Sequence, residues 1–212
     1  MKHILITIAA VVALGNGQFN VFGVTGKDSS STTKSTKGEW KYLDNGLIRI
    51  GVNKSRGACI GFFGDSKTKR NVLNHYDHGR FIQQSYYGDL DGSNWNGKQW
   101  RYNPIQGGSW QGKDARVLEL RINKDKDSLY AKIEPRHWAN GNSCPEAIME
   151  QWITLEGSVA NVRSKMTYKG KDHHLARHQE MPAVFVDAVL CLLYTSPSPR
   201  DVEEWGVGGW WL

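Results

Sequence analysis

The chain has 212 residues, of which 39% are hydrophobic and 23% are charged, and its formal net charge is +6. This length and composition exclude a fully disordered chain and leave room for one buried core. No internal run reaches the roughly 18 apolar residues that a membrane-spanning helix needs, so only the N-terminus is expected to engage a membrane. Nine Trp, eight Tyr and 23 Gly favour strands and loops over a helical bundle.

The N-terminus has the pattern of a secretory signal peptide. A short basic start precedes an apolar stretch from Ile4 to Leu14, and small residues follow where a signal peptidase cleaves. We therefore expect residues 1–17 to be a signal peptide and the protein to be secreted or periplasmic, without stable membrane insertion after signal removal. Residues 18–38 are polar and rich in Ser, Thr and Lys, which predicts a flexible linker.

Strand signals then follow one another up to residue 187. The segments 39–43 and 47–53 flank Asn45-Gly46, a pair that favours a tight hairpin turn. Further segments bounded by Gly, Asn, Asp or Pro continue the series at 57–63, 80–88, 116–123, 128–135, 147–157, 159–170 and 182–187. No segment shows sustained helical periodicity. The expected fold is all-β, an antiparallel β-sandwich within residues 39–190.

Two cysteines lie in this region, Cys59 in an apolar run and Cys144 beside Pro145. In an oxidising compartment they could form a disulfide, or both could stay as unpaired thiols. The sequence leaves these alternatives open. No Cys-x-x-Cys motif and no zinc-finger spacing accompanies them.

Two segments carry a resemblance to a known family: DNGLIRIGVNKSRGACIGFF and the following NVLNHYDHGRFIQQSYYG. These segments resemble the start of galactose mutarotase-like β-sandwich domains. The blocks NPIQGGSW, MEQWITL and RHQEMPAVFV extend the resemblance over about residues 45–187, and the pattern is similar to that of secreted bacterial carbohydrate-active proteins. The resemblance implies a sugar ligand. It does not imply mutarotation, because the His-Pro and downstream acidic motifs of aldose 1-epimerases have no counterpart.

Aromatic and planar polar residues are dense between residues 88 and 110. Aromatic rings cover the apolar faces of sugars, while amide, carboxylate and guanidinium groups hydrogen-bond adjacent hydroxyls. A long loop inside a compact domain is usually functional. We therefore expect Trp95, Trp100 and Trp110 to bind substrate. In the alternative interpretation, two or three of these tryptophans close one end of the sandwich.

A second polar cluster precedes the strand expected at 80–88. His75, Asp77 and Arg80 are candidate substrate-binding residues, Arg80 because a guanidinium can clamp a carboxylate or vicinal hydroxyls. Strand alternation predicts that Gln84 and Tyr86 share the face of Arg80 and bind substrate with it. The alternative is an ion pair between Asp77 and Arg80 that holds a turn.

A third cluster precedes the apolar strand near residue 182. His178 and Glu180 are two residues apart, so an extended chain projects them to the same side. We expect both to be catalytic, because a histidine and a carboxylate can share acid and base work on a sugar. Glu150 shares a face with Trp152, and it is predicted either to contact the ligand or to lie on the solvent face.

No cofactor and no metal site is predicted. The series Asp89, Asp91 and Ser93 begins like a calcium loop but lacks the required Gly and Glu. The candidate zinc ligands have no recognised spacing; they are His75, His78 and His178. Phosphate-loop and dinucleotide motifs are absent.

The C-terminal segment from Cys191 to Asp201 reads CLLYTSPSPRD and resembles translated sequencing adapter. This resemblance implies that residues 191–212 are a sequencing artefact and that 39–190 is the N-terminal part of a longer domain, truncated at its C-terminus. A natural Ser-Pro tail is the alternative. Without the segment the chain has 26 basic and 18 acidic residues, which is a net charge of +8.

This positive charge is scattered along the chain, so we expect no nucleic-acid partner and favour an acidic polysaccharide. Two functions remain open. The first is a carbohydrate-active enzyme of glycoside hydrolase or lyase type that binds and processes a polysaccharide or oligosaccharide. The second is a non-catalytic carbohydrate-binding module.

Overall fold

The computed structural model describes residues 2–10, 38–170 and 179–187. Within these ranges the strands pair in antiparallel fashion, there is no α-helix, and the helical element is η1, a 3-10 turn at Lys54–Arg56. The predicted all-β class is confirmed. The same part of the chain has no helix long and apolar enough to cross a membrane.

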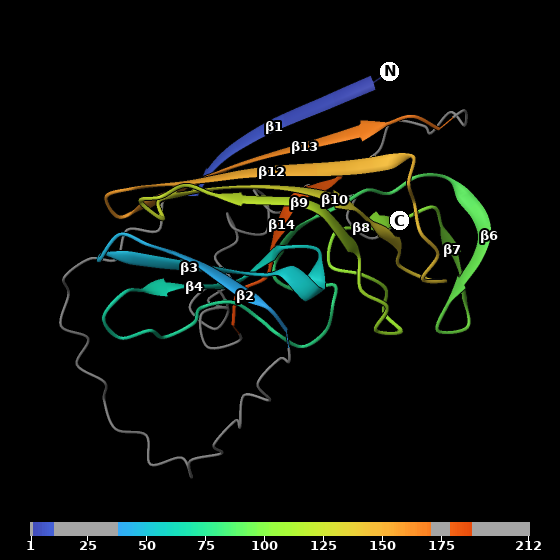
Figure 1. The fold of residues 1–212 in the computed structure, drawn as a ribbon. Helices are drawn as coiled ribbons and strands as arrows, with labels where there is room; N and C mark the ends of the chain where they lie inside the picture. Colours follow the sequence, from blue (N-terminus) through green and yellow to red (C-terminus); the bar gives the residue numbers. More distant parts are fainter. Residues whose placement is uncertain (1, 11–37, 171–178, 188–212) are drawn as a thin grey trace, which may run out of the picture.

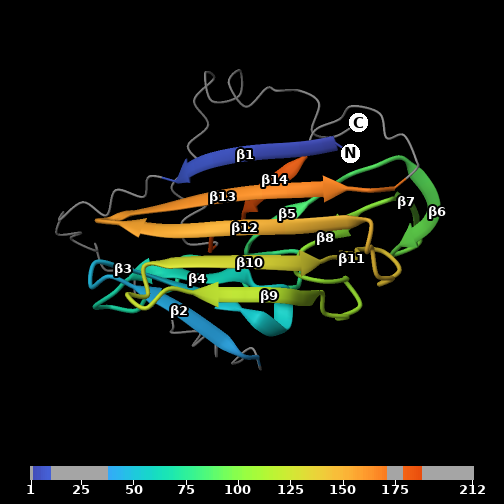
Figure 2. The same ribbon diagram turned by 45° about the horizontal axis from the view of Figure 1, so that its top comes forward.

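Two sheets form two layers (Figures 1 and 2). The five-stranded sheet has the order β1-β13-β12-β10-β9. Its strands are β1 (Lys2–Ala10), β9 (Arg116–Ile122), β10 (Ser128–Glu134), β12 (Ala147–Glu156) and β13 (Val159–Tyr168). The seven-stranded sheet has the order β11-β8-β5-β4-β3-β2, and β14 pairs with β5 beside this path. Its strands are β2 (Trp40–Asp44), β3 (Ile48–Asn53), β4 (Cys59–Asp65), β5 (Ile82–Ser85), β8 (Pro104–Ile105), β11 (Arg136–His137) and β14 (Glu180–Val184).

The hydrophobic core lies between these two sheets. Ile50 and Val52 of β3 contribute from one layer, and Ile133 of β10 with Met149 and Ile153 of β12 contribute from the other. Each of these side chains is at most 1% exposed, and full burial of such a side chain stabilises the fold by about 1.5 to 3 kcal/mol. Because side chains alternate along a strand, this core leaves every second residue of β2 and β3 on the outer face.

Buried glutamines also join the two sheets. Gln84 of β5 donates from Nε2 to the carbonyl of Glu150 in β12 at 2.9 Å. Gln106, next to β8, donates to Oε1 of Gln151 in β12 at 3.1 Å, and Gln151 donates to the carbonyl of Ala58. These bonds give partners to the buried Nε2 groups of all three glutamines, which would be costly to leave unpaired, whereas Oε1 of Gln84 has no partner among the described residues.

The hairpin predicted at residues 39–53 is confirmed as β2 and β3, but its turn differs in detail. Only Gly46 of the Asn45-Gly46 pair has a positive φ, at 82°. Asn45 instead accepts hydrogen bonds at Oδ1 from the amides of Leu47 and Ile48, at 3.1 and 3.0 Å. Asn45 therefore contributes through its side chain and not through a left-handed backbone.

The expectation of a long loop at residues 88–110 is wrong. Residues Leu90–Trp95 form β6 and residues Lys98–Arg101 form β7, which pair as a separate two-stranded sheet at one end of the molecule (Figure 1). Asn96 and Gly97 connect them, with φ values of 50° and 79°. Two successive positive φ values are what a type I′ hairpin turn requires, and Asn-Gly is a pair that adopts them readily.

Only part of the two chain termini is described by the structure. Residues Lys2–Ala10, inside the predicted signal peptide, pair with β13 from Lys2 opposite Tyr168 to Ala10 opposite Ala160. The predicted linker, apart from residue 38, and the predicted artefact at 191–212 lie outside the described residues. Signal removal and secretion stay predictions.

The two cysteines of the domain are free thiols. Both are buried; burial raises the pKa of Cys59 well above its usual range and raises the pKa of Cys144 to about 12. A thiol in this state is not a nucleophile at neutral pH, because the thiolate is the reactive form. Of the two alternatives for Cys59 and Cys144, the structure has the unpaired thiols and not the disulfide.

Glu150 lies on the outer face of the five-stranded sheet and pairs with its neighbours there. The hydroxyl of Tyr130 donates to Oε1 of Glu150 at 2.7 Å, and Nζ of Lys165 lies 3.4 Å from Oε2. Arg163 covers the ring of Trp152 at 4.2 Å from its centroid. These cross-strand partners match the solvent-face alternative for Glu150.

Candidate functional site

An open hollow of about 410 Å³ lies where the loop 74–81 meets β14 and the residues that follow it. It is lined by Asn74, Tyr76, Arg80, Val184, Phe185 and Val186. Backbone hydrogen bonds join the two segments: the amide of Asn74 donates to the carbonyl of Phe185 at 2.9 Å, and the amide of Phe185 donates to the carbonyl of Phe81 at 3.3 Å. The strand pairing of β14 with β5 thus brings a segment near residue 180 next to one near residue 80.

Arg80 is the cation of this hollow. Its guanidinium carbon lies 4.8 Å from the centroid of the Phe185 ring, which is cation–π distance. Its Nε is 3.9 Å from Oδ1 of Asp77, and its side chain is 39% exposed. A separation of 3.9 Å is too long for a hydrogen bond. Among the described residues, no acceptor forms a hydrogen bond with the Arg80 guanidinium, and Asp77 is its ion-pair partner.

Asp77 stabilises the turn that presents Arg80. Its Oδ1 accepts from the amide of Gly79 at 2.8 Å, and its carbonyl accepts from the amide of Arg80 at 3.2 Å. The long ion pair with Arg80 comes in addition to these bonds. Asp77 therefore fits the turn-holding alternative, and its predicted contact with substrate stays a prediction.

Glu180 is a partly buried carboxyl beside this cation. Burial raises its pKa above the ordinary value of 4.5, while a hydrogen bond from Tyr87 and the charge of Arg80 act in the opposite direction. Burial, and then the charge of Glu180, raise the pKa of Tyr87 to about 12. The carboxyl consequently holds a proton to a higher pH than a solvated glutamate, and the phenol stays a hydrogen-bond donor.

Gln179 fixes the position of Tyr87 relative to β14. Its side-chain Oε1 accepts from the amide of Tyr87 at 2.6 Å, and its Nε2 donates to the carbonyl of Tyr87 at 3.0 Å. This two-point contact spans 92 residues of sequence. Glu180 and Tyr87 are thereby placed by backbone contacts and not by their own interaction alone.

The expectation that Gln84 and Tyr86 share the face of Arg80 is wrong. The strand β5 begins only at Ile82, and Phe81 has a φ of 85°, so the alternation does not extend back to Arg80. Gln84 is fully buried between the sheets, and Tyr86 packs at 6.4 Å from the rings of Tyr102 and Tyr168. Neither residue lines the hollow.

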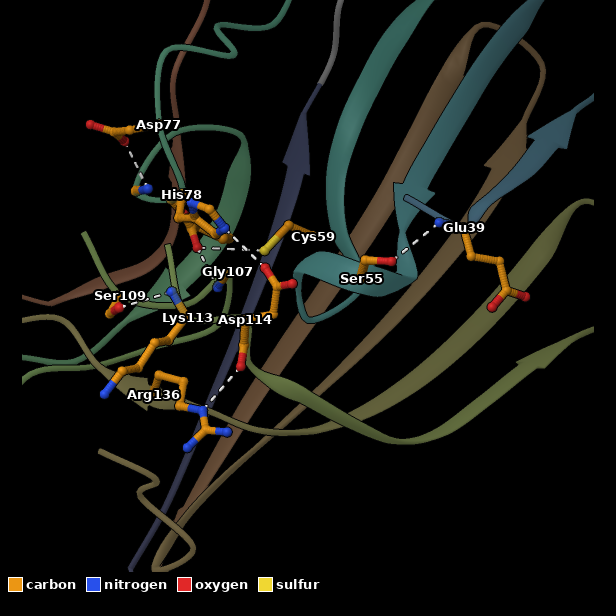
Figure 3. A network of polar contacts seen from close by, with 12 residues as sticks. Glu39, Ser55, Cys59, Asp77, His78, Gly107, Ser109, Lys113, Asp114 and Arg136 are labelled. Carbon is orange, nitrogen blue, oxygen red and sulfur yellow. Dashed lines mark hydrogen bonds and ion pairs between the residues drawn. The ribbon is translucent and has the colours of Figure 1, made fainter. Parts of the chain in front are cut away.

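The two described histidines of the 74–81 loop have separate environments. Nε2 of His75 contacts the carbonyl of Gly61, and its ring lies against Trp40. His78 instead contacts Asp114, with Nε2 2.9 Å from Oδ1 of that carboxyl (Figure 3). Burial is the main cause that lowers the pKa of both rings. The described residues contain no group of three metal ligands, and His178 lies outside them.

Two of the three tryptophans expected to bind substrate, Trp95 and Trp100, pack against each other in the hairpin of β6 and β7. Trp95 lies 4.7 Å from Trp100 and 6.1 Å from Trp138, and Trp100 donates from Nε1 to Oδ1 of Asn103 at 3.2 Å. Trp110 is 39% exposed and donates to the carbonyl of Ala139 at 2.8 Å. This packing favours the alternative in which tryptophans close the end of the sandwich; none of them lines the hollow.

Of the residues that line the hollow, only Arg80 was predicted from the sequence. The residues that were not predicted are Asn74, Tyr76, Val184, Phe185 and Val186 of the lining, and Tyr87 beside Glu180. Tyr76 and Phe185 are aromatic residues in segments already singled out, so their composition was a usable signal. Tyr87 was placed on the face opposite Arg80, because nothing in the sequence marks the positive φ of Phe81. Comparison with family models, with curated proteins and with solved structures finds no match to this chain.

Proposed function

We propose that this chain is a secreted carbohydrate-active protein that binds an acidic polysaccharide or oligosaccharide at the hollow beside β14 and processes it by hydrolase or lyase chemistry. The observation that carries the proposal is the position of Arg80, stacked on Phe185 at an open hollow and next to the raised-pKa carboxyl of Glu180. A cation, an aromatic face and a proton donor are the groups that an acidic sugar requires.

Arg80 and the aromatic residues serve binding in this proposal. Stacking on Phe185 holds the guanidinium plane in place and leaves its N–H edge for the carboxylate of a uronate or for vicinal hydroxyls. Tyr76 is 85% exposed at the same hollow, and its ring offers an apolar surface to a sugar.

Glu180 serves proton transfer. A carboxyl whose pKa is raised by burial can donate a proton to a leaving-group oxygen at a pH where a solvated glutamate is already ionised. Tyr87, with a pKa of about 12, acts as a hydrogen-bond donor that orients Glu180 and not as a base. His178, two residues before Glu180, stays the predicted catalytic partner.

The galactose mutarotase-like type of sandwich is part of this proposal. Two facing antiparallel sheets are compatible with it. The segment that carries the resemblance, NVLNHYDHGRFIQQSYYG, contains the loop 74–81 and β5, which build one side of the hollow. The resemblance and the hollow therefore concern the same residues.

A non-catalytic carbohydrate-binding module is the second candidate. In the described part of the chain, the residues that line the hollow include one cation and no carboxylate. Glycoside hydrolysis generally uses two carboxyl groups across the scissile bond. A surface with a single cation and aromatic rings is sufficient for binding alone.

Turnover and affinity of variants separate the two candidates. We expect Glu180→Gln to lower kcat about a hundredfold with KM nearly unchanged, because a positioned acid is lost. Arg80→Ala should weaken binding by about 1 to 3 kcal/mol through loss of charged hydrogen bonds. Matched controls are Glu119→Gln and Arg121→Ala, since these two exposed residues pair with each other at 2.9 Å on the other sheet.

No turnover by the wild type, with affinity still dependent on Arg80, would leave the binding module as the function. Full turnover by Glu180→Gln would instead contradict the catalytic role of Glu180. Equal affinity of wild type, Arg80→Ala and Arg121→Ala for every glycan would contradict both candidates.

A further inference from the structure

The outer face of β2 carries a short row of near-parallel rings. Trp40 and Tyr42 are two residues apart on the strand and so project from the same face. Their ring planes differ by 14°, with centroids 6.0 Å apart. His75, from the loop 74–81, adds a third ring at 11° to Trp40 and 6.2 Å from it.

Glycines provide the space in which two of these rings lie. A Cβ at Gly61 would be 2.7 Å from Cη2 of Trp40, and a Cβ at Gly51 would be 2.5 Å from Cε1 of Tyr42. Neither glycine has a positive φ. Glycine at these two positions therefore makes room for the rings and does not serve an unusual backbone conformation. Trp40 and Tyr42 rest side by side on the backbone of the sheet.

A cation, Arg56, lies near this row. The guanidinium carbon of Arg56, the last residue of η1, is 5.9 Å from the centroid of Phe81. The His75 ring lies 5.0 Å from the same Phe81 ring, so Arg56 and His75 both neighbour Phe81. In the ranges that the structure describes, Arg56 forms no ion pair, whereas Arg49 at the other end of the row lies 3.8 Å from Asp44.

A purely structural role accounts for part of this arrangement. A ring placed over a strand glycine stabilises the sheet by covering exposed backbone. That role needs one ring for each glycine. It requires neither the alignment of His75 with Trp40 nor a guanidinium near Phe81 that forms no ion pair with the described residues. An anion that stacks on the rings would use both.

We propose that Trp40, His75 and Arg56 form a second subsite, which binds one anionic sugar of a polysaccharide by stacking on the two rings and pairing its carboxylate or sulfate with Arg56. The inference rests on the proposed function and names its substrate class. His75 is adjacent to Tyr76 and belongs to the same loop as Arg80, so one extended glycan can contact this subsite and the hollow on either side of the loop.

Titration calorimetry with three oligosaccharides of equal length tests the subsite: oligogalacturonate, sulfated oligogalactan and neutral oligogalactan. Arg56→Gln is expected to weaken binding of an anionic oligomer about tenfold or more, the loss of one charged contact, and to leave the neutral oligomer unchanged. Arg121→Gln removes the same charge from the other sheet and should change neither. Whichever anionic oligomer responds identifies a carboxylate or a sulfate as the recognised group.

A spectroscopic readout complements the affinities. An anion next to Arg56 would raise the pKa of His75. A proton NMR titration of the wild-type protein should therefore give a higher His75 pKa with saturating oligomer than without it. Equal effects of Arg56→Gln and Arg121→Gln, or an unchanged His75 titration, would overturn the subsite. If Arg80→Ala loses binding while Arg56→Gln binds like the wild type, the proposed function is supported and the second subsite is contradicted. A wild-type protein that binds none of the oligomers would remove both.

Discussion

Glu180 links the chemistry of the hollow to the stability of the protein. Burial raises its pKa in the folded state above 4.5, so the native protein binds this proton more tightly than the unfolded chain does. The stabilising contribution is complete below pH 4.5 and is lost as the pH rises through the native pKa. Wild type should therefore lose unfolding free energy relative to Glu180→Gln across this range. Urea unfolding at a series of pH values measures the difference, and parallel curves would contradict the raised pKa.

His78 has the opposite dependence. Burial lowers its pKa below 6.5, and the hydrogen bond and charge of Asp114 partly offset this effect. The native protein therefore loses stability as the pH falls below 6.5, because only the unfolded chain takes up the proton freely. We expect Asp114→Asn to lower the pKa of His78 further, as followed by NMR titration, with exposed Asp125→Asn as the unaffected control. A pKa that rises in Asp114→Asn would refute this account of the pair.

At the residue scale, the sequence predicts some residues of the site but not how they lie relative to one another. Residue type alone selects Arg80 and Glu180; the structure has Arg80 in the lining of the hollow, and the charge of Arg80 acts on the Glu180 carboxyl, which is not among the lining residues. Gln84 and Tyr86 were assigned to the wrong side, because a Phe at φ 85° interrupts the alternation. Aromatic residues seldom adopt positive φ, so no local pattern predicts this break.

At the scale of elements, the ring of Trp40 depends on Gly61 beneath it. Gly61→Ala would place a methyl group 2.7 Å from Cη2 of Trp40, and the forced displacement should cost about 1 to 3 kcal/mol of unfolding free energy. In a Trp40→Ala background the same change should cost much less. A double-mutant cycle measured by denaturant unfolding gives the coupling. Additive effects of the two substitutions would show that the ring does not occupy this space.

Strands were the most predictable elements. Alternating segments such as 128–135 and 147–157 correspond to β10 and β12, since one buried face imposes a period of two. The hairpin of β6 and β7 was not predicted from the sequence, although Asn96-Gly97 marks its turn. The dense aromatic and polar residues of 88–110 are typical of a sugar-binding loop, which is why a loop was predicted there. The pairing of β14 with β5 depends on contacts far apart in sequence, and no local signal reports it.

At the scale of the whole molecule, buried amides hold the two sheets in register. Gln151 accepts from Gln106 and donates to the carbonyl of Ala58. Gln151→Ala removes the donor to the Ala58 carbonyl and one of the two acceptors of Gln106, which keeps its bond to the carbonyl of Gly57. The unfolding free energy should therefore fall by about 1 to 3 kcal/mol. Gln99→Ala, at an exposed position of β7, is the matched control. Equal stability of the two variants in urea would mean that these bonds contribute nothing across the core.

Hydrogen exchange of the full chain with and without an acidic oligosaccharide tests the central claim most directly, because it locates the ligand. Binding at the hollow should slow exchange of the amides in residues 74–81 and 180–187, where backbone hydrogen bonds join the two segments. The hairpin at residues 90–101 should exchange as before. Protection confined to that hairpin, or no protection at a ligand concentration that saturates binding, would contradict a glycan site at the hollow.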